Sequence, residues 1–207
     1  MNVVVDMSSR RQSAQSLPAP LVLGIGGTLR PHSTSEQALR IALQAAEQHG
    51  ARTEIITAQE LDLPMYDFGC GTLEKAARLI DAVRRADGLI VSTPAYHGGL
   101  SGLLKNALDY LQELAGDPSP YLHRKAVGCI VSAGGWQAGA ATLVSIRSIV
   151  HALRGWPTPL GVTVNSANKP FSPDGDIQDI KIGEQLRILG GQVATFAQGR
   201  QLACATG

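Results

Sequence analysis

The sequence predicts a doubly wound α/β fold, in which a parallel sheet lies between two layers of helices. Three observations predict it. Short aliphatic runs typical of buried parallel strands alternate with longer amphipathic segments typical of helices. The apolar content, 44% of 207 residues, is enough for a single core. Stretches rich in glycine and small polar residues follow three of the aliphatic runs, which is where such sheets bind ligands.

The aliphatic runs define five strands, predicted over residues 21–25, 53–56, 89–92, 127–132 and 160–164. The amphipathic segments predict helices over residues 34–49, 72–86, 101–115, 139–154 and 177–203. Each strand is followed by one helix, and crossovers between parallel strands are right-handed. We therefore expect a three-layer α/β/α sandwich with a five-stranded parallel sheet in the order 2-1-3-4-5, the flavodoxin-like arrangement.

Residues 1–20 are polar and predict a disordered leader before one folded domain over residues 21–207. Arg10 and Arg11 look like a twin-arginine export signal, but the apolar segment that such a signal needs does not follow them. The three cysteines Cys70, Cys129 and Cys204 are widely spaced and outside any CxxC motif. This pattern predicts reduced thiols and a cytoplasmic protein, without a disulfide framework or a metal site.

The charges are balanced, with 18 basic and 17 acidic residues and no long run of either sign. A nucleic-acid-binding surface would usually need a basic stripe, so we expect no nucleic-acid partner. No apolar stretch approaches the roughly 18–20 residues that cross a bilayer, so we expect no membrane partner either.

The first of the three loops, "GGTLRPHSTS", joins the first strand to the first helix. A helix start offers unpaired N–H groups, and hydroxyls and an arginine suit phosphate oxygens. We expect Thr28, Arg30, Ser33 and Ser35 to bind a terminal phosphate. The dinucleotide fingerprint GxGxxG fails because Leu29 stands at the place of its third glycine. The alternative is an ordinary helix N-cap at this turn.

The second loop follows the third strand and contains Pro94, Ala95, Tyr96, His97 and Gly98. Such a stretch can offer backbone amides and carbonyls to the edge of a flat heterocycle. His97 is a conceivable acid or base, but no serine, cysteine or carboxylate near it in the sequence completes a catalytic set. We expect it to be a loop residue, and we assign no catalytic side chain.

The third loop follows the fourth strand. Ser132, Ala133, Gly134 and Gly135 are expected to approach a ring system from the other side, and Trp136 next to them fits either cofactor stacking or a packing contact. Trp156 is expected to pack.

Together the three loops resemble the NADPH-dependent FMN reductase family, over residues 21–164. The first loop is similar to the family pattern Gly-Ser-x-Arg followed by Ser-x-Asn or Ser-x-Ser. The segment "TPAYHGGLSGLLKNALDYL" resembles the pattern Pro-Glu-Tyr-Asn-Gly-x-x-x-Gly-x-Leu-Lys-Asn-Ala-Leu-Asp, with Ala95 and His97 in place of the glutamate and the asparagine. The loop of residues 132–135 is similar to a glycine-containing loop of the family.

The resemblance implies noncovalent FMN, with its phosphate on the first loop and its ring between the second and third. It implies hydride transfer from NADPH or NADH, with electrons passing on to free flavin, a quinone, an azo compound or a partner monooxygenase. It also implies a homodimer or homotetramer. Three alternatives stay open: an FMN-dependent dehydrogenase of a small biosynthetic intermediate, an electron-transfer module, and a phosphate-binding hydrolase or transferase. The last would need a nucleophile or metal carboxylates, which Asp67 and Asp87 do not clearly supply.

The helix over residues 101–115 carries more leucines than one narrow stripe can hold. We expect its surplus apolar face to be buried in a two-fold interface beside the flavin. The residues concerned are Leu103, Leu104, Leu108, Tyr110, Leu111 and Leu114.

Overall fold

The computed structural model describes residues 17–26, 28–68 and 74–206. In this part of the chain, a sheet of seven strands has a parallel core in the order β2-β1-β3-β5-β6. β5 overlaps the fourth expected strand and pairs with β3, and β7 (Val162–Asn165), which overlaps the fifth, pairs with β5. The predicted order 2-1-3-4-5 is therefore confirmed, but the sheet has seven strands where five were expected. The core strands are β1 (Leu21–Gly26), β2 (Arg52–Ile56), β3 (Gly88–Tyr96), β5 (Ala126–Ala133) and β6 (Trp156–Pro157).

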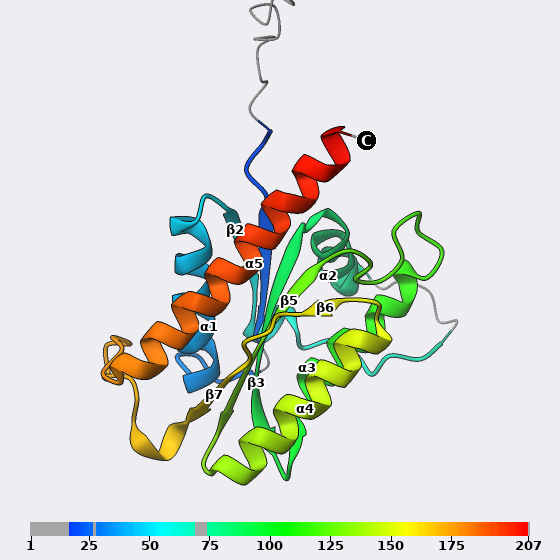
Figure 1. Cartoon of the computed structure of the whole chain (residues 1–207). Helices are drawn as coiled ribbons and strands as arrows, with labels where there is room; N and C mark the ends of the chain where they lie inside the picture. The colour runs from blue at the N-terminus through cyan, green and yellow to red at the C-terminus, as the bar shows by residue number, and fades with distance from the viewer. Residues whose placement is uncertain (1–16, 27, 69–73, 207) are drawn as a thin grey trace, which may run out of the picture.

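The helices cover both faces of the sheet, as predicted (Figure 1). On one face, α1 (Thr34–Gln48) and α5 (Ile180–Thr206) bury one apolar core against the sheet. On the other, α2 (Glu74–Arg85), α3 (Gly102–Asp109) and α4 (Trp136–Ala152) bury a second one. The described part of the chain also contains three short 3-10 turns: η2 (Ala58–Glu60), η3 (Tyr110–Leu114) and η4 (Ser166–Asn168).

Two short strands lie beside β5 where the sequence predicted one strand over residues 160–164, and only the second of them overlaps that range. β6 pairs with the start of β5, and β7 (Val162–Asn165) pairs with its end. The segment between them contains Pro159, which has no N–H to donate to a sheet ladder. The Thr158 hydroxyl donates instead to the carbonyl of Leu160, at 2.8 Å. The sheet therefore has two short strands where one was expected.

The predicted loop of residues 94–98 is largely strand, which corrects its assignment. β3 runs on to Tyr96 and the chain then folds back into β4 (Gly99–Leu100), antiparallel to it. The two residues of the turn, His97 and Gly98, have φ angles of 52° and 80°. Two successive positive φ angles are typical of the hairpin turn whose twist matches that of its strands. The segment is therefore a β-hairpin that extends the end of β3.

The apolar side chains of residues 101–115 are covered by their own subunit, so the argument for a surplus face is wrong. Leu104, Leu108, Tyr110, Leu111 and Leu114 are each at most 3% exposed. Leu103 is half-buried and packs at the border of the same core. The helix ends at Asp109 and continues as η3, which turns the remaining leucines toward the core. This segment leaves no broad apolar stripe for a partner.

Part of the expectations falls on residues 1–16 and 69–73, which lie outside the described residues. They include most of the predicted leader and Cys70. Cys129 is buried and Cys204 is exposed, and both are free. None of the helices in the described part combines the length and the apolar content needed to cross a bilayer.

Lys125 closes the C-terminal end of α2 from inside the protein. It is 3% exposed, and its ammonium group donates to the carbonyls of Val83 and Ala86, both at 2.6 Å, and of Arg84 at 3.2 Å. Burial lowers the pKa of Lys125 to about 8, with the charge of Arg200 acting in the same direction. At neutral pH the side chain is still charged and satisfies helix-end carbonyls that have no partner within the helix.

We expect Lys125→Met to destabilise the protein by about 2 kcal/mol, because it leaves these buried carbonyls without a donor. For a chain of this size, that is a fall in Tm of roughly 4–8 °C. Thermal unfolding followed by circular dichroism measures it. Lys105→Met is the matched control, since Lys105 makes an exposed ion pair with Asp109 that contributes little. Equal Tm values for the two variants would contradict the assigned role.

Candidate functional site

A cavity of about 160 Å³ lies at the carboxyl ends of β1, β3 and β5. The three loops that the sequence singled out meet there. All of the predicted site residues except His97, Gly98 and Gly135 line it. Its lining consists of Thr28, Arg30, Ser33, Thr34, Ser35, Pro94, Ala95, Tyr96, Ser132, Ala133, Gly134 and Ser166. We call it the site cavity.

The first loop gathers hydroxyl groups at the start of α1. Ser33 is the N-cap of this helix, and its side chain accepts a hydrogen bond from the backbone N–H of Glu36, at 3.3 Å. Its hydroxyl also lies 3.2 Å from that of Ser35, and both side chains are buried. The Thr28 hydroxyl accepts from the backbone N–H of Arg30, at 2.9 Å. Ser33 therefore caps α1 and, together with Thr28 and Ser35, also lines the site cavity.

The lining of the site cavity contains one charged side chain, that of Arg30, and no carboxylate. Arg30 is exposed and takes part in no ion pair among the residues that the structure describes. Glu36, the nearest acid in the sequence, is engaged elsewhere: it pairs with Arg40 at 2.7 Å and accepts from the backbone N–H of His32 at 3.1 Å. The positive end of the α1 dipole adds to the charge of Arg30. The site cavity is thus suited to an anion.

The loops are held together across strands. The Ser92 hydroxyl in β3 donates to the carbonyl of Ser35, at 2.7 Å, and is fully buried. Pro94 and Ser132 are paired residues of β3 and β5. The hydrogen bond of Ser92 fixes the first loop to β3. The second and third loops begin at residues that pair with each other in β3 and β5. A site built on strand ends in this way is preorganised for a ligand.

Three predicted residues lie outside the cavity lining. His97 and Gly98 form the hairpin turn, and a side chain added at Gly98 would meet no described atom within 4 Å. Gly135 is the N-cap of α4 and is similarly free of close neighbours in the described chain. Tyr96 and Trp136 are each 58% exposed, next to these turns. Both aromatic residues therefore lie largely exposed at the rim of the site cavity.

Thr34 and Ser166 line the cavity but were not among the predicted site residues. Ser166 begins η4, directly after β7. The sequence carries a signal for Ser166, because ligands of such sheets lie beyond the carboxyl ends of the central strands and Ser166 closely follows the fifth predicted strand. Thr34 directly follows the cap residue Ser33.

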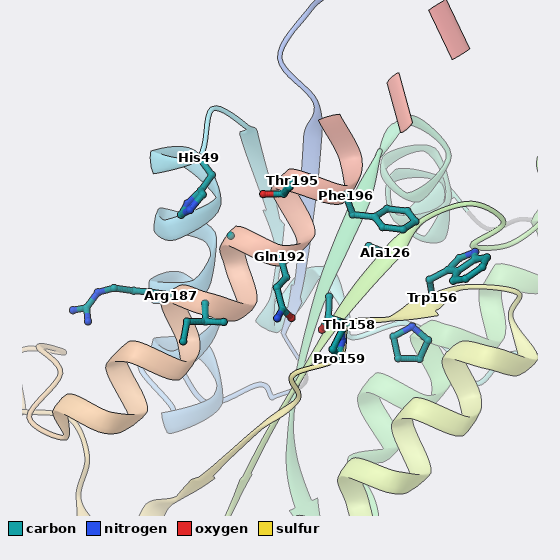
Figure 2. A pocket seen from close by; sticks show the side chains of 12 residues that line it. His49, Ala126, Trp156, Thr158, Pro159, Arg187, Gln192, Thr195 and Phe196 are labelled. Atoms are coloured by element: carbon teal, nitrogen blue, oxygen red, sulfur yellow. The ribbon is translucent and has the colours of Figure 1, made fainter. Parts of the chain in front are cut away.

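A larger cavity, of about 820 Å³, lies away from these loops, over α5 and β6 (Figure 2). It is bordered by Trp156 and Phe196, whose ring centroids are 6.3 Å apart. Trp156 was expected to pack; its ring lies against that of Phe196, and 61% of the residue stays exposed. The lining holds no carboxylate, cysteine or serine, and none of the predicted loops reaches it. Size alone does not make this cavity the catalytic one.

The lining of the site cavity holds no carboxylate, and Asp87, one of the two acids considered for hydrolysis or metal binding, lies elsewhere. Asp87 precedes β3, at the opposite end of the sheet, and is ion-paired with Arg200. Its carboxylate also accepts from the backbone N–H of Leu21, at 2.9 Å. Within the described ranges, there is no group of three or more His, Cys, Asp or Glu side chains that could hold a metal ion.

Comparison with known proteins identifies the family. The profile of the NADPH-dependent FMN reductases matches residues 20–169, which include all three loops. The chain belongs to the NADPH-dependent FMN reductase family. It is 31% identical over 150 residues to an NADPH azoreductase of Bacillus sp. (strain OY1-2), covering 72% of this chain and 76% of the relative. It is 28% identical over 178 residues to an FMN-dependent NADPH-azoreductase of Staphylococcus aureus, covering 82% and 91%.

A solved structure has the same fold. The flavoenzyme NAD(P)H:acceptor oxidoreductase FerB of Paracoccus denitrificans superposes with a TM-score of 0.71 at 18% identity, over 87% of this chain and 98% of that one. As a member of the FMN reductase family, the chain is an FMN-dependent NAD(P)H oxidoreductase with a flavodoxin-like fold. The expectations for family, activity and cofactor are confirmed.

Proposed function

We propose that the site cavity binds the phosphate of FMN through Thr28, Arg30, Ser33 and Ser35. The observation that carries this assignment is the donor set: buried hydroxyls, an arginine without an ion pair among the described residues, and the N-terminus of α1 around one cavity. These groups fit a dianionic phosphate, because charged donors make the strongest hydrogen bonds to it. The residues present therefore suit the cofactor that the family uses.

We assign the flavin ring to the rim formed by the hairpin turn, Tyr96 and residues 132–135. The site cavity, at about 160 Å³, is smaller than the roughly 300–1,000 Å³ typical of cavities that enclose a whole ligand. The ring must then lie beyond it. Gly98, Gly134 and Gly135 have no described neighbour where a side chain would be, so a flat ring can approach their backbone.

Bound FMN supplies a redox centre that accepts hydride from the nicotinamide of NADPH or NADH. The chain itself would supply position: residues at the strand ends would hold the two cofactors in contact, and proximity of this kind accounts for a large part of a rate enhancement. Tyr96 and the hairpin backbone would border the ring, and no side chain would be required to move a proton in this step. This account agrees with the lack of an acid–base set in the cavity lining.

We propose an azo compound as the electron acceptor, because two curated relatives are named azoreductases. The test is anaerobic turnover of FMN-loaded protein with NADPH and an azo dye, followed by loss of the dye colour. We expect two NADPH consumed for each azo bond cleaved to amines. If reduced flavin instead leaves the protein during rapid gel filtration and the dye persists, free flavin or a partner monooxygenase is the acceptor.

We propose a homodimer in the cytoplasm that associates through the exposed face of α4. Trp136 and Val144 are 58% and 70% exposed, and Ala140 lies between them at helical spacing on the same face. This stripe begins next to Gly135, beside the proposed ring position, so a second subunit seated on it would also cover the flavin. The free thiols of Cys129 and Cys204 support a reducing compartment.

We expect Val144→Asp to convert the dimer to a monomer, because it would bury a carboxylate in an apolar interface. Light scattering at micromolar concentration measures the mass. Ile180→Asp is the matched control, since Ile180 is 74% exposed at the start of α5, away from this stripe. A monomeric parent protein, or dissociation by the control variant alone, would contradict the interface.

A further inference from the structure

A cavity of about 420 Å³ adjoins the site cavity along α1 and the segment that follows β7. Thr34 and Ser166 line both cavities, so the two are neighbours at these residues. We call it the adjoining cavity. Its other lining residues are His32, Gln37, Lys169, Pro170, Phe171, Ser172, Pro173 and Gln178.

The outer wall of the adjoining cavity is a structured segment. The backbone N–H of Ser172 donates to the carbonyl of Asp176, at 2.8 Å, and Phe171 forms an isolated β-bridge with Ile177. Phe171 is 9% exposed and belongs to the core beneath α1 and α5. A wall fixed by hydrogen bonds and by a core residue gives the cavity a defined shape, as preformed ligand sites have.

The adjoining cavity carries a positive charge. Lys169 is exposed and has no ion pair among the described residues, and the lining holds no carboxylate. Its backbone has φ 48° and ψ 59°, and its N–H donates to the carbonyl of Ser166, at 3.2 Å. The left-handed conformation, uncommon for a residue other than glycine, fixes Lys169 at the end of η4. An anionic group in the adjoining cavity would therefore have a cationic partner.

The rest of the lining suits a heterocyclic base. Pro170, Phe171 and Pro173 form an apolar wall, and Gln37 and Gln178 offer amide groups that donate and accept. Ser172 and the shared Ser166 add hydroxyls. An apolar surface with a few polar groups around it is the usual composition of a small-molecule site. Together with Lys169, this set matches a nucleoside phosphate.

We propose that the adjoining cavity is a nucleotide subsite that takes the adenosine-phosphate half of FAD, so that the protein binds FAD as well as FMN. The inference rests on the proposed position of the flavin phosphate in the site cavity. FAD is FMN joined through its phosphate to adenosine monophosphate, so its second half begins where the two cavities meet. Lys169 would bind the second phosphate, and the wall of Pro170, Phe171 and Pro173 would contact adenine.

The adenosine end of NADPH also consists of adenine, ribose and phosphate, so NADPH is the other ligand that could occupy the adjoining cavity. The position of the cavity favours FAD: it opens next to the phosphate-binding hydroxyls and lies away from the hairpin and residues 132–135, where the nicotinamide must meet the ring. Substitutions in the adjoining cavity distinguish the two ligands. If FAD occupies the cavity, they change the affinity for FAD; if NADPH occupies it, they change the KM for NADPH.

The test is a titration of flavin-free protein with FAD and with FMN, followed by quenching of flavin fluorescence. Lys169→Asn removes the charge while keeping a residue that tolerates the left-handed conformation. Gln37→Trp fills the cavity from α1 without entering the site cavity. Each variant is expected to weaken FAD binding about tenfold, which corresponds to the loss of one charge-assisted contact. The Kd for FMN is expected to stay within about twofold of that of the parent protein.

Lys181→Asn, at an exposed lysine of the first turn of α5, is the matched control and should change neither Kd. Unchanged FAD binding in both cavity variants overturns the proposal, and a raised KM for NADPH with unchanged FAD binding assigns the subsite to the dinucleotide. Arg30→Ala distinguishes a failure of the proposed nucleotide subsite from a failure of the proposed phosphate position. If it weakens FMN and FAD alike while the cavity variants do nothing, the subsite fails alone; if it affects neither flavin, the proposed phosphate position fails as well.

Discussion

Arg30→Ala is expected to weaken FMN binding about 10- to 100-fold. The arginine has no ion pair among the described residues and lines the site cavity beside the buried hydroxyls of Ser33 and Ser35. A charge-assisted hydrogen bond to phosphate contributes roughly 1.5–3 kcal/mol, which corresponds to this range. Titration of the flavin-free variant with FMN, followed by fluorescence quenching, measures the change.

Riboflavin, which lacks the phosphate, provides the internal comparison. Its affinity should be nearly the same in the parent protein and in Arg30→Ala. Arg78→Ala is the matched control, because Arg78 forms an exposed ion pair with Glu60, away from the three loops. An equal loss for both flavins would show that Arg30 supports the fold of the loop and does not contact phosphate.

Gly190→Ala is expected to destabilise the protein by about 3 kcal/mol, a fall in Tm of roughly 6–12 °C. Gly190 lies where α5 crosses α1, and a Cβ atom there would stand 2.1 Å from the backbone oxygen of Ala42 and 3.1 Å from the Cβ of Ala45. Because the obstacle is backbone, the helices themselves must move apart. The separation would reduce the burial of the core between them, and thermal unfolding of the flavin-free protein measures it.

Gly199→Ala, in the same helix, is the control for helix propensity. No described atom lies within 4 Å of the position of its Cβ, so alanine should stabilise the protein by roughly 0.5–1 kcal/mol. If Gly190→Ala also raised the Tm, the close crossing of α1 and α5 would be contradicted.

The order of the central strands could be predicted because aliphatic runs and amphipathic helices alternate so regularly. The meeting of the three loops followed from the same pattern, since parallel strands end at one edge of the sheet. The interruption between β6 and β7 was harder to predict, because Val162 and Val164 continue an apolar run whose hydrogen bonding Pro159 breaks. Periodicity of side chains does not report whether a backbone ladder is complete.

Two features of the site depend on backbone conformation and long-range contacts. The hairpin at His97 and Gly98 needs positive φ angles at both residues, and histidine is not a common residue for such a position. Ser166 reaches the cavity because β7 ends beside β5, a neighbour relation that the local sequence around residue 166 does not carry. The burial of residues 101–115 likewise depends on the change from α3 to η3 at Asp109.

The central claim is that this chain transfers hydride by positioning FMN and nicotinamide, without an acid or base from a side chain. It is tested by anaerobic single-turnover reduction of FMN-loaded protein, with NADPH deuterated at one face of C4, in the parent and in His97→Asn. Asparagine tolerates the left-handed conformation of the turn and removes the titratable ring. The account predicts that deuterium on one face slows flavin reduction in both proteins, and that His97→Asn keeps most of the rate. Loss of reduction in His97→Asn with FMN still bound would contradict it and assign a proton-transfer role to His97.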